Sequence, residues 1–169
     1  MHDKELTYCF TTAINSHVDS NLTRYYDAFH ATLVEQLNAW KIDARLCRNP
    51  VRDKLTESPF LCFQRRTDGD VLLEEFKIAG SAQRRHGRSL LQHGSILLKM
   101  STASPELAGI ADLTGNDISA WGLSAAWYPR IADRLGVTLV PDRATDDERQ
   151  LAGQICRDKF ESSGWTCRR

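Results

Sequence analysis

A cysteine and a lysine near the middle of the chain have the types and the spacing to perform covalent chemistry together. Cys62 lies fifteen residues before Lys77. A single hairpin between them would bring the two side chains close to each other. A neighbouring cation favours the thiolate, which is the form of cysteine that attacks a thioester. An ammonium group can also hold an acyl oxygen while negative charge develops on it. Such a pair therefore suits acyl chemistry.

Positive charge gathers immediately after the lysine. Lys77, Arg84, Arg85 and Arg88 lie within twelve residues that contain no acid, although the whole chain balances 22 Lys and Arg against 22 Asp and Glu. This patch suits an anionic ligand or an acidic protein partner. For the three arginines, a solvated hairpin tip is the alternative. A nucleic-acid surface is not favoured, because no aromatic residues are interleaved with the cations.

Two β-hairpins are predicted to position these groups. In the first, strands Phe60–Arg66 and Asp70–Phe76 flank Asp68-Gly69, and in the second, Lys77–Arg85 turns through His86-Gly87 into Ser89–Leu98. Glycines inside the second hairpin, Gly80 and Gly94, indicate a bulge or the close approach of a ligand.

The other predicted elements enclose these hairpins. They are a strand at Glu5–Thr12, a helix from Ser20 or Asn21 to Trp40, a strand at Ile42–Leu46, a surface loop at Asn49–Ser58, and helices at Pro105–Ala111, Ile118–Leu135 (broken or kinked at Pro129) and Asp146–Phe160. The order predicts an α+β fold with a mixed, largely antiparallel sheet flanked by helices.

Composition excludes several classes of protein. No apolar run approaches the ~20 residues of a membrane helix, and the N-terminus has no signal-peptide core, so we expect a cytoplasmic protein that binds no membrane. The five cysteines form no C-x-x-C pair, which favours free thiols over a zinc ribbon or disulfides. We expect Cys9, Cys47 and Cys156 to be small buried residues. No metal site is predicted, because His86 and His93 lack nearby acidic or thiol partners in sequence.

Specific motifs resemble those of one family. K-I-A-G-S-A-Q-R-R from Lys77 and L-Q-H-G-S-I-L-L from Leu91 resemble the central motif of the biotin/lipoate A/B protein ligase family, which includes lipoate–protein ligases and cysteine-dependent octanoyltransferases. H-D-K-E-L-T-Y-C-F from His2 and K-F-E-S-S-G-W-T-C-R-R from Lys159 extend the resemblance over nearly the whole chain. It implies one catalytic domain over residues 1–169, similar to class II aminoacyl-tRNA synthetase and biotin synthetase domains. The family's glycine-rich segment, which precedes the H-D-x-E-L-T-Y stretch, is not in this sequence.

The resemblance also implies roles for residues. Lys77 matches the lysine that reaches the acyl carbonyl. Cys62 matches the acyl-accepting cysteine of a C-F-x-x-P-S stretch, although Arg65 and Arg66 replace the small residue and the proline. The residues expected at the substrate are Gly80, Ser81, Gln83, His93, Gly94 and Ser95, with Arg84, Arg85 and Arg88 at a partner protein. A hydrogen-bonded core position is the alternative for His93. Candidates for an acyl channel, or simply for the core, are Ile78, Leu90, Leu91, Ile96 and Leu97.

The function that the resemblance implies is transfer of an octanoyl or lipoyl group to a lysine of a carrier protein, through a Cys62 thioester assisted by Lys77. Acyl carrier protein would be the donor, and a lipoyl domain or glycine cleavage H protein the acceptor. This transfer requires no cofactor. The alternatives are a lipoate–protein ligase that uses ATP and magnesium, and a non-catalytic fragment that binds an acyl chain or a lipoyl domain. Without the glycine-rich segment, the strands that it would cover become exposed sheet edges. Because exposed edges favour pairing with another chain, we predict a homodimer.

Overall fold

A computed structural model describes residues 3–14, 22–48 and 61–167 of the chain. The chain divides into two compact units, Met1–Thr138 and Leu139–Arg169. No helix of the described residues is long and apolar enough to cross a lipid bilayer. The prediction of one domain over residues 1–169 stays a prediction.

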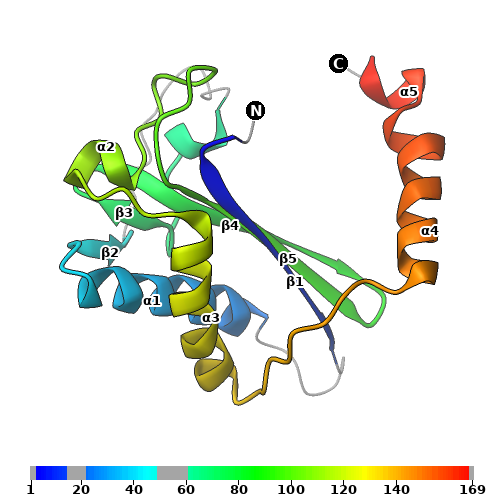
Figure 1. Cartoon of the computed structure of the whole chain (residues 1–169), viewed down its shortest axis with the longest axis horizontal. Coiled ribbons are helices and arrows are strands. Elements are labelled where there is room, and N and C mark those ends of the chain that lie inside the picture. Colours follow the sequence, from blue (N-terminus) through cyan, green and yellow to red (C-terminus); the bar gives the residue numbers. More distant parts are fainter. Residues whose placement is uncertain (1–2, 15–21, 49–60, 168–169) are drawn as a thin grey trace. The chain divides into compact units, whose positions relative to one another are not determined.

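The first unit is built on a five-stranded sheet in the order β1-β5-β4-β3-β2, in which every neighbouring pair is antiparallel (Figure 1). The strands are β1 (Glu5–Ala13), β2 (Ala44–Leu46), β3 (Val71–Leu73), β4 (Phe76–His86) and β5 (Ser89–Leu97). The helices are α1 (Thr23–Ala39), the 3₁₀ turn η1 (Cys62–Gln64), α2 (Ile110–Thr114) and α3 (Ala120–Leu135). The predicted α+β class with an antiparallel sheet is confirmed.

Helices α1 and α3 lie side by side on one face of the sheet (Figure 1). This helix-covered face buries an apolar core that includes Phe29, Leu33, Val71, Ile96 and Trp127. The indole N–H of Trp127 donates to the hydroxyl of Thr32 at 3.0 Å, which joins the two helices inside the core. Burial of these side chains provides most of the stabilisation of the sheet.

The opposite, outer face of the sheet is polar. Strand alternation places on it the exposed residues Thr7, Cys9, Ala82 and His93. Among the predicted buried cysteines, Cys47 is buried, but Cys9 and Cys156 are exposed, so the prediction is wrong for those two. For Cys9 the reason is its position on this outer face.

A β-bulge at Ile78 changes which face Lys77 occupies. Val71 pairs with Ala79, whereas Leu72 pairs with Lys77, so Ile78 is an additional residue in β4. In a regular strand Lys77 would share a face with Ala79, two residues later. The inserted residue reverses this relation, so Ala79 packs in the core while Lys77 lies on the outer face.

The first predicted hairpin is wrong. Cys62–Gln64 forms the turn η1 rather than a strand, and β3 turns into β4 through Glu74 and Glu75, with a φ of 49° at Glu74. The physical reason lies in the polar segment before β3. The carboxylate of Asp70 accepts hydrogen bonds from the backbone N–H of Thr67 at 2.6 Å and from its hydroxyl at 3.0 Å, which closes a turn where the strand was expected. Phe60, where that strand was expected to begin, lies outside the described residues.

The other predicted elements agree with the structure more closely. The strand Glu5–Thr12, the helix ending near Trp40, the strand near Leu46 and the second hairpin are confirmed as β1, α1, β2 and β4–β5. Ser20, Asn21 and the loop Asn49–Ser58 lie outside the described residues.

Two helix predictions need correction. Helix α2 begins at Ile110 rather than Pro105, and α3 is not broken at Pro129, where a kink stays a prediction. The buried residues Trp127 and Ile131 on either side of Pro129 hold this helix on the core, which offsets the lost backbone hydrogen bond. Gly136, with a φ of 66°, ends α3 as expected.

The second unit contains α4 (Asp146–Ile155), the π-helical turn η2 (Cys156–Phe160) and α5 (Ser163–Thr166). Thr145 caps α4, where its hydroxyl accepts from the N–H of Glu148, while the Glu148 carboxylate accepts from the N–H of Thr145. These elements confirm the predicted helix over Asp146–Phe160, with a change of helix type at Cys156.

Candidate functional site

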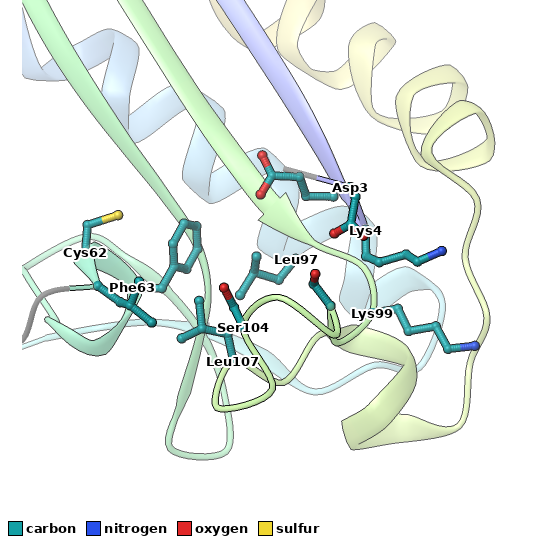
Figure 2. Close-up of a pocket in the computed structure, with 11 residues that line it drawn as sticks. Asp3, Lys4, Cys62, Phe63, Leu97, Lys99, Ser104 and Leu107 are labelled. Carbon is teal, nitrogen blue, oxygen red and sulfur yellow. The ribbon is translucent and has the colours of Figure 1, made fainter. Parts of the chain in front are cut away.

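A pocket of about 220 Å³, lined in part by Cys62, lies at one end of the outer face (Figure 2). We call it the thiol pocket, and its apolar residues are Leu61, Phe63, Leu97 and Leu107, with Asp3, Lys4, Glu5, Lys99, Ser101 and Ser104 as polar residues. The turn η1 contributes Cys62 and Phe63, and the end of β5 contributes Leu97. Figure 2 shows these side chains around the hollow, with the sulfur of Cys62 at its margin. Cys62 is exposed and therefore accessible to a reactant.

Lys77 is held beside this pocket by an ion pair. Its Nζ lies 2.9 Å from Oδ2 of Asp70, and the two side chains are only 10% and 1% exposed. Nζ also donates to the carbonyl oxygen of Arg65 at 3.2 Å. It lies 5.5 Å from the ring centroid of Phe63, the residue that follows Cys62. The amine is therefore fixed at a defined position next to η1.

A second pocket of about 270 Å³ contains Lys77, and we call it the amine pocket. Phe63 and Leu107 line both pockets, so the two pockets adjoin at these side chains. Cys62 and Lys77 thus lie on the same side of the sheet, in neighbouring hollows. A mechanism that uses both groups requires them to lie on the same side of the sheet, and their catalytic roles stay predictions.

The residues that were expected around the substrate lie on both faces of the sheet. Gly80 and Ser95 pair across β4 and β5 on the outer face, the side on which Lys77 lies. The hydroxyl of Ser95 donates to Oε1 of Glu5 at 2.7 Å. His93 is also on the outer face, opposite Cys9 and Ala82. Because His93 is exposed, the alternative of a hydrogen-bonded core histidine is wrong.

Ser81, Gln83 and Gly94 lie on the helix-covered face. Nε2 of His30, in α1, lies 2.6 Å from the hydroxyl of Ser81, and the phenol of Tyr8 lies 2.5 Å from the same hydroxyl. Gln83 donates to the carbonyl oxygen of Leu22 at 3.0 Å. A Cβ on Gly94 would lie 2.5 Å from the hydroxyl of Ser81, so this glycine is needed for packing. Substrate contact by these three residues stays a prediction.

The protonation of the buried His30 follows from its partners. Nδ1 lies 2.6 Å from the carbonyl oxygen of Gly69, which can only accept, so Nδ1 carries the hydrogen. Nε2 then accepts from Ser81, and Ser81 accepts from Tyr8. Burial is the largest influence on His30 and lowers its pKa below the usual 6.5. The imidazole is therefore neutral near pH 7.

The expected partner-binding arginines, Arg84, Arg85 and Arg88, are exposed at the tip of the β4–β5 hairpin, where Gly87 has a φ of 56°. This tip is at the opposite end of β4 from Lys77. Of the channel candidates, Leu97 lines the thiol pocket, Leu91 is half-buried, and Ile78, Leu90 and Ile96 belong to the core. The described residues contain no group of three or more His, Cys, Asp or Glu that could hold a metal ion.

Sequence reasoning missed the residues that hold the lysine, Asp70 and Tyr26, and the histidine behind Ser81, His30. The phenol of Tyr26 donates to Oδ1 of Asp70 at 3.1 Å. An acid directly before the apolar run V-L-L was the one available signal for Asp70. Tyr26 and His30 lie four residues apart, on one face of α1.

Known proteins are similar to this chain in sequence and in fold. Residues 1–114 match the family model of the lipoyl protein ligase A/B catalytic domain. The chain is 26% identical, over an alignment of 196 residues, to the octanoyltransferase LipM of Geobacillus kaustophilus, and the match covers 100% of this chain and 70% of that protein.

Two solved structures are similar at the level of the fold. A lipoate-protein ligase A bound with ATP has a TM-score of 0.71 at 18% identity, over 96% of this chain and 64% of that one. A bi-partite lipoate protein ligase from Thermoplasma acidophilum, described with its E2 lipoyl domain, has a TM-score of 0.70 at 17% identity, over 96% and 63%. This chain thus spans less than two thirds of the length of either ligase, and the likeness concerns the fold alone.

Proposed function

Because the chain belongs to the lipoyl protein ligase A/B catalytic-domain family, we propose that it transfers an octanoyl or lipoyl group to a lysine of a carrier protein through a thioester on Cys62. The observation that supports this most directly is the position of Phe63. Its side chain lines the pocket of the thiol and lies 5.5 Å from the amine of Lys77, so the amine lies next to the pocket that Cys62 lines.

The proposed reaction has two transfers. The Cys62 thiolate attacks the carbonyl carbon of a donor thioester, the new C–S bond forms, and the donor thiol leaves with the proton that Cys62 gave up. Lys77 donates a hydrogen bond to the oxygen that becomes negative during attack. The amine of the acceptor lysine then attacks the Cys62 thioester, which forms the amide and releases the Cys62 thiol.

The thiol pocket suits the acyl chain. Leu61, Phe63, Leu97 and Leu107 provide apolar contact, and each buried CH₂ of a chain contributes about 0.8 kcal/mol. The pocket of about 220 Å³ is smaller than the sites of roughly 300–1,000 Å³ that hold drug-sized ligands. A single unbranched chain fits such a volume better than a broad ligand.

The proposed partners follow from the same reaction. Acyl carrier protein would be the donor, and a lipoyl domain or glycine cleavage H protein the acceptor, in the cytoplasm. The exposed arginines of the β4–β5 tip would contact acidic residues of a carrier protein. A second copy of the chain would pair along the edge of β1.

The test is an intact-mass measurement after incubation with octanoyl-loaded acyl carrier protein. We expect an octanoyl adduct that hydroxylamine removes and that is absent from Cys62→Ala. Cys9→Ala is the matched control, because Cys9 is also an exposed thiol on the outer face, and it should retain the adduct. An adduct that persists in Cys62→Ala would contradict the proposal.

The same experiment separates the two alternatives. The fold likeness to a ligase bound with ATP supports lipoate–protein ligase activity as the second candidate. Lipoylation of a carrier only when ATP and magnesium are added, with no thioester adduct, would support it. Carrier binding without either reaction would support a binding module.

A further inference from the structure

We infer that Asp70 is a positioning residue for acyl transfer, because it holds Lys77 with one N–H free to meet the acyl oxygen. The inference rests on the proposed function. The carboxylate of Asp70 is 1% exposed, and burying a charge without partners would be strongly unfavourable. The buried carboxylate of Asp70 therefore needs hydrogen-bond donors or a cation beside it. The groups that meet this need indicate what Asp70 does.

Three groups other than the lysine fix this carboxylate. The N–H and the hydroxyl of Thr67 both donate to Oδ2, and the phenol of Tyr26 donates to Oδ1. Tyr26 belongs to α1 and Thr67 to the turn before β3, so Asp70 is anchored to both the helix and this turn. Burial, followed by the charge of Asp70, raises the pKa of Tyr26, so this phenol remains a donor.

The strand places the lysine against this anchored carboxylate. The bulge at Ile78 brings Lys77 to the outer face, and its side chain lies over Gly80. An ammonium group has three N–H donors. In the described part of the chain, Asp70 and the carbonyl of Arg65 account for two of them. The third can donate to an oxygen beside Phe63.

The ion pair also has a chemical consequence. An uncharged amine beside a thioester would itself be a nucleophile and would take the acyl group. As an ammonium paired with a carboxylate, Lys77 has no lone pair and can act only as a donor. Asp70 thus directs the acyl group to Cys62 and then to the acceptor.

The main test compares Asp70→Asn with Asp68→Asn under single-turnover conditions with octanoyl-loaded acyl carrier protein. Asp68 is two residues away and exposed, so its variant controls for the change of charge. We expect Asp70→Asn to lower the maximal rate of Cys62 acylation about tenfold or more, as for loss of an oxyanion donor, with KM changed less than about twofold. Asp68→Asn should leave both values unchanged.

A double-mutant cycle distinguishes positioning from a merely structural role. In a Lys77→Met background, Asp70→Asn should change the rate by less than about twofold, because its effect passes through the lysine. Tyr26→Phe, which keeps the carboxylate, provides a milder variant for the same cycle should Asp70→Asn fail to fold. An effect of equal size with and without Lys77 would overturn the inference.

A third measurement probes the Lys77 amine directly and does not depend on acyl transfer. Reductive methylation of the resting protein, followed by peptide mass spectrometry, reports the accessibility of each amine. We expect Lys77 to be labelled about tenfold faster in Asp70→Asn than in the wild type, relative to the exposed Lys4. Unchanged labelling would overturn the inference. A wild-type protein that forms no adduct while this labelling difference is present would contradict only the proposed function.

Discussion

A Cβ atom on Gly80 would lie 2.5 Å from Cε and 2.8 Å from Nζ of Lys77. Because Gly80 has no side chain, the end of the Lys77 side chain can occupy the space beside it. The sequence indicates a bulge or the close approach of a ligand at Gly80. In the structure, the group that approaches is the chain's own lysine.

Gly80→Ala should displace Lys77 without unfolding the protein. The atoms in conflict are at the end of a flexible side chain, but that side chain is paired with the buried Asp70, so we expect a loss of about 1–3 kcal/mol in the free energy of unfolding. The rate of Cys62 acylation should fall about tenfold to a hundredfold, because the donor is misplaced. Gly164→Ala, whose Cβ would meet nothing within 4 Å, is the control. Full activity in Gly80→Ala would show that the position of Lys77 is unimportant.

Leu97→Phe should shorten the acyl chain that the thiol pocket accepts. Leu97 lines the pocket, and a larger side chain there would fill space that the end of an octanoyl chain occupies. Because each buried CH₂ contributes about 0.8 kcal/mol, the ratio of octanoyl to butanoyl adduct formation should fall about tenfold. Leu91→Phe, on the same face and strand, should leave the ratio unchanged. If the ratio of octanoyl to butanoyl adduct were the same in both variants, the acyl chain would not bind beside Leu97.

The free energy of unfolding should decrease as the pH falls below about 6.5, in part because of His30. Its pKa is lowered in the folded state, so in this range the unfolded chain binds the proton more readily and is favoured. The stabilisation is complete above 6.5 and is lost as the pH falls towards the folded-state pKa. The charged groups Asp70, Lys77 and Asp27 act on the imidazole as well.

The comparison with His30→Gln isolates this contribution in denaturant unfolding between pH 5 and pH 7.5. A glutamine can donate to Gly69 and accept from Ser81, yet it does not titrate. The variant should show a shallower decrease over this range. Parallel pH profiles for the two proteins would mean that His30 does not titrate on unfolding.

Light scattering at high concentration should give a mass near twice 19.1 kDa. β1 is at one end of the strand order, so in the described part of the sheet one of its edges has no strand beside it. Unpaired backbone groups along a nine-residue edge favour pairing with another strand. Dilution should restore the monomer, and a monomeric mass at high concentration would exclude the proposed dimer.

The sequence predicted well those elements whose signals are local. Alternation in β1, helical spacing in α1 and the His86-Gly87 turn are each contained within a few residues, so the elements formed where expected. The segment between Cys62 and Val71 was predicted wrongly because its conformation depends on Asp70, whose carboxylate binds Thr67, Tyr26 and Lys77 at once. Tyr26 is 44 residues away from Asp70, and a partner so distant leaves no periodic pattern in the segment.

The sequence by itself determined the family motif, the thiol, the amine and the largely antiparallel sheet that carries them. Only the tertiary structure decided which face each site residue occupies. One additional residue at Ile78 reverses the side-chain alternation of β4, which separates Lys77 from Ser81 and places it with Cys62. Side chains alternate with a period of two, so a single inserted residue exchanges the faces, and its position depends on pairing with β3 rather than on β4 alone.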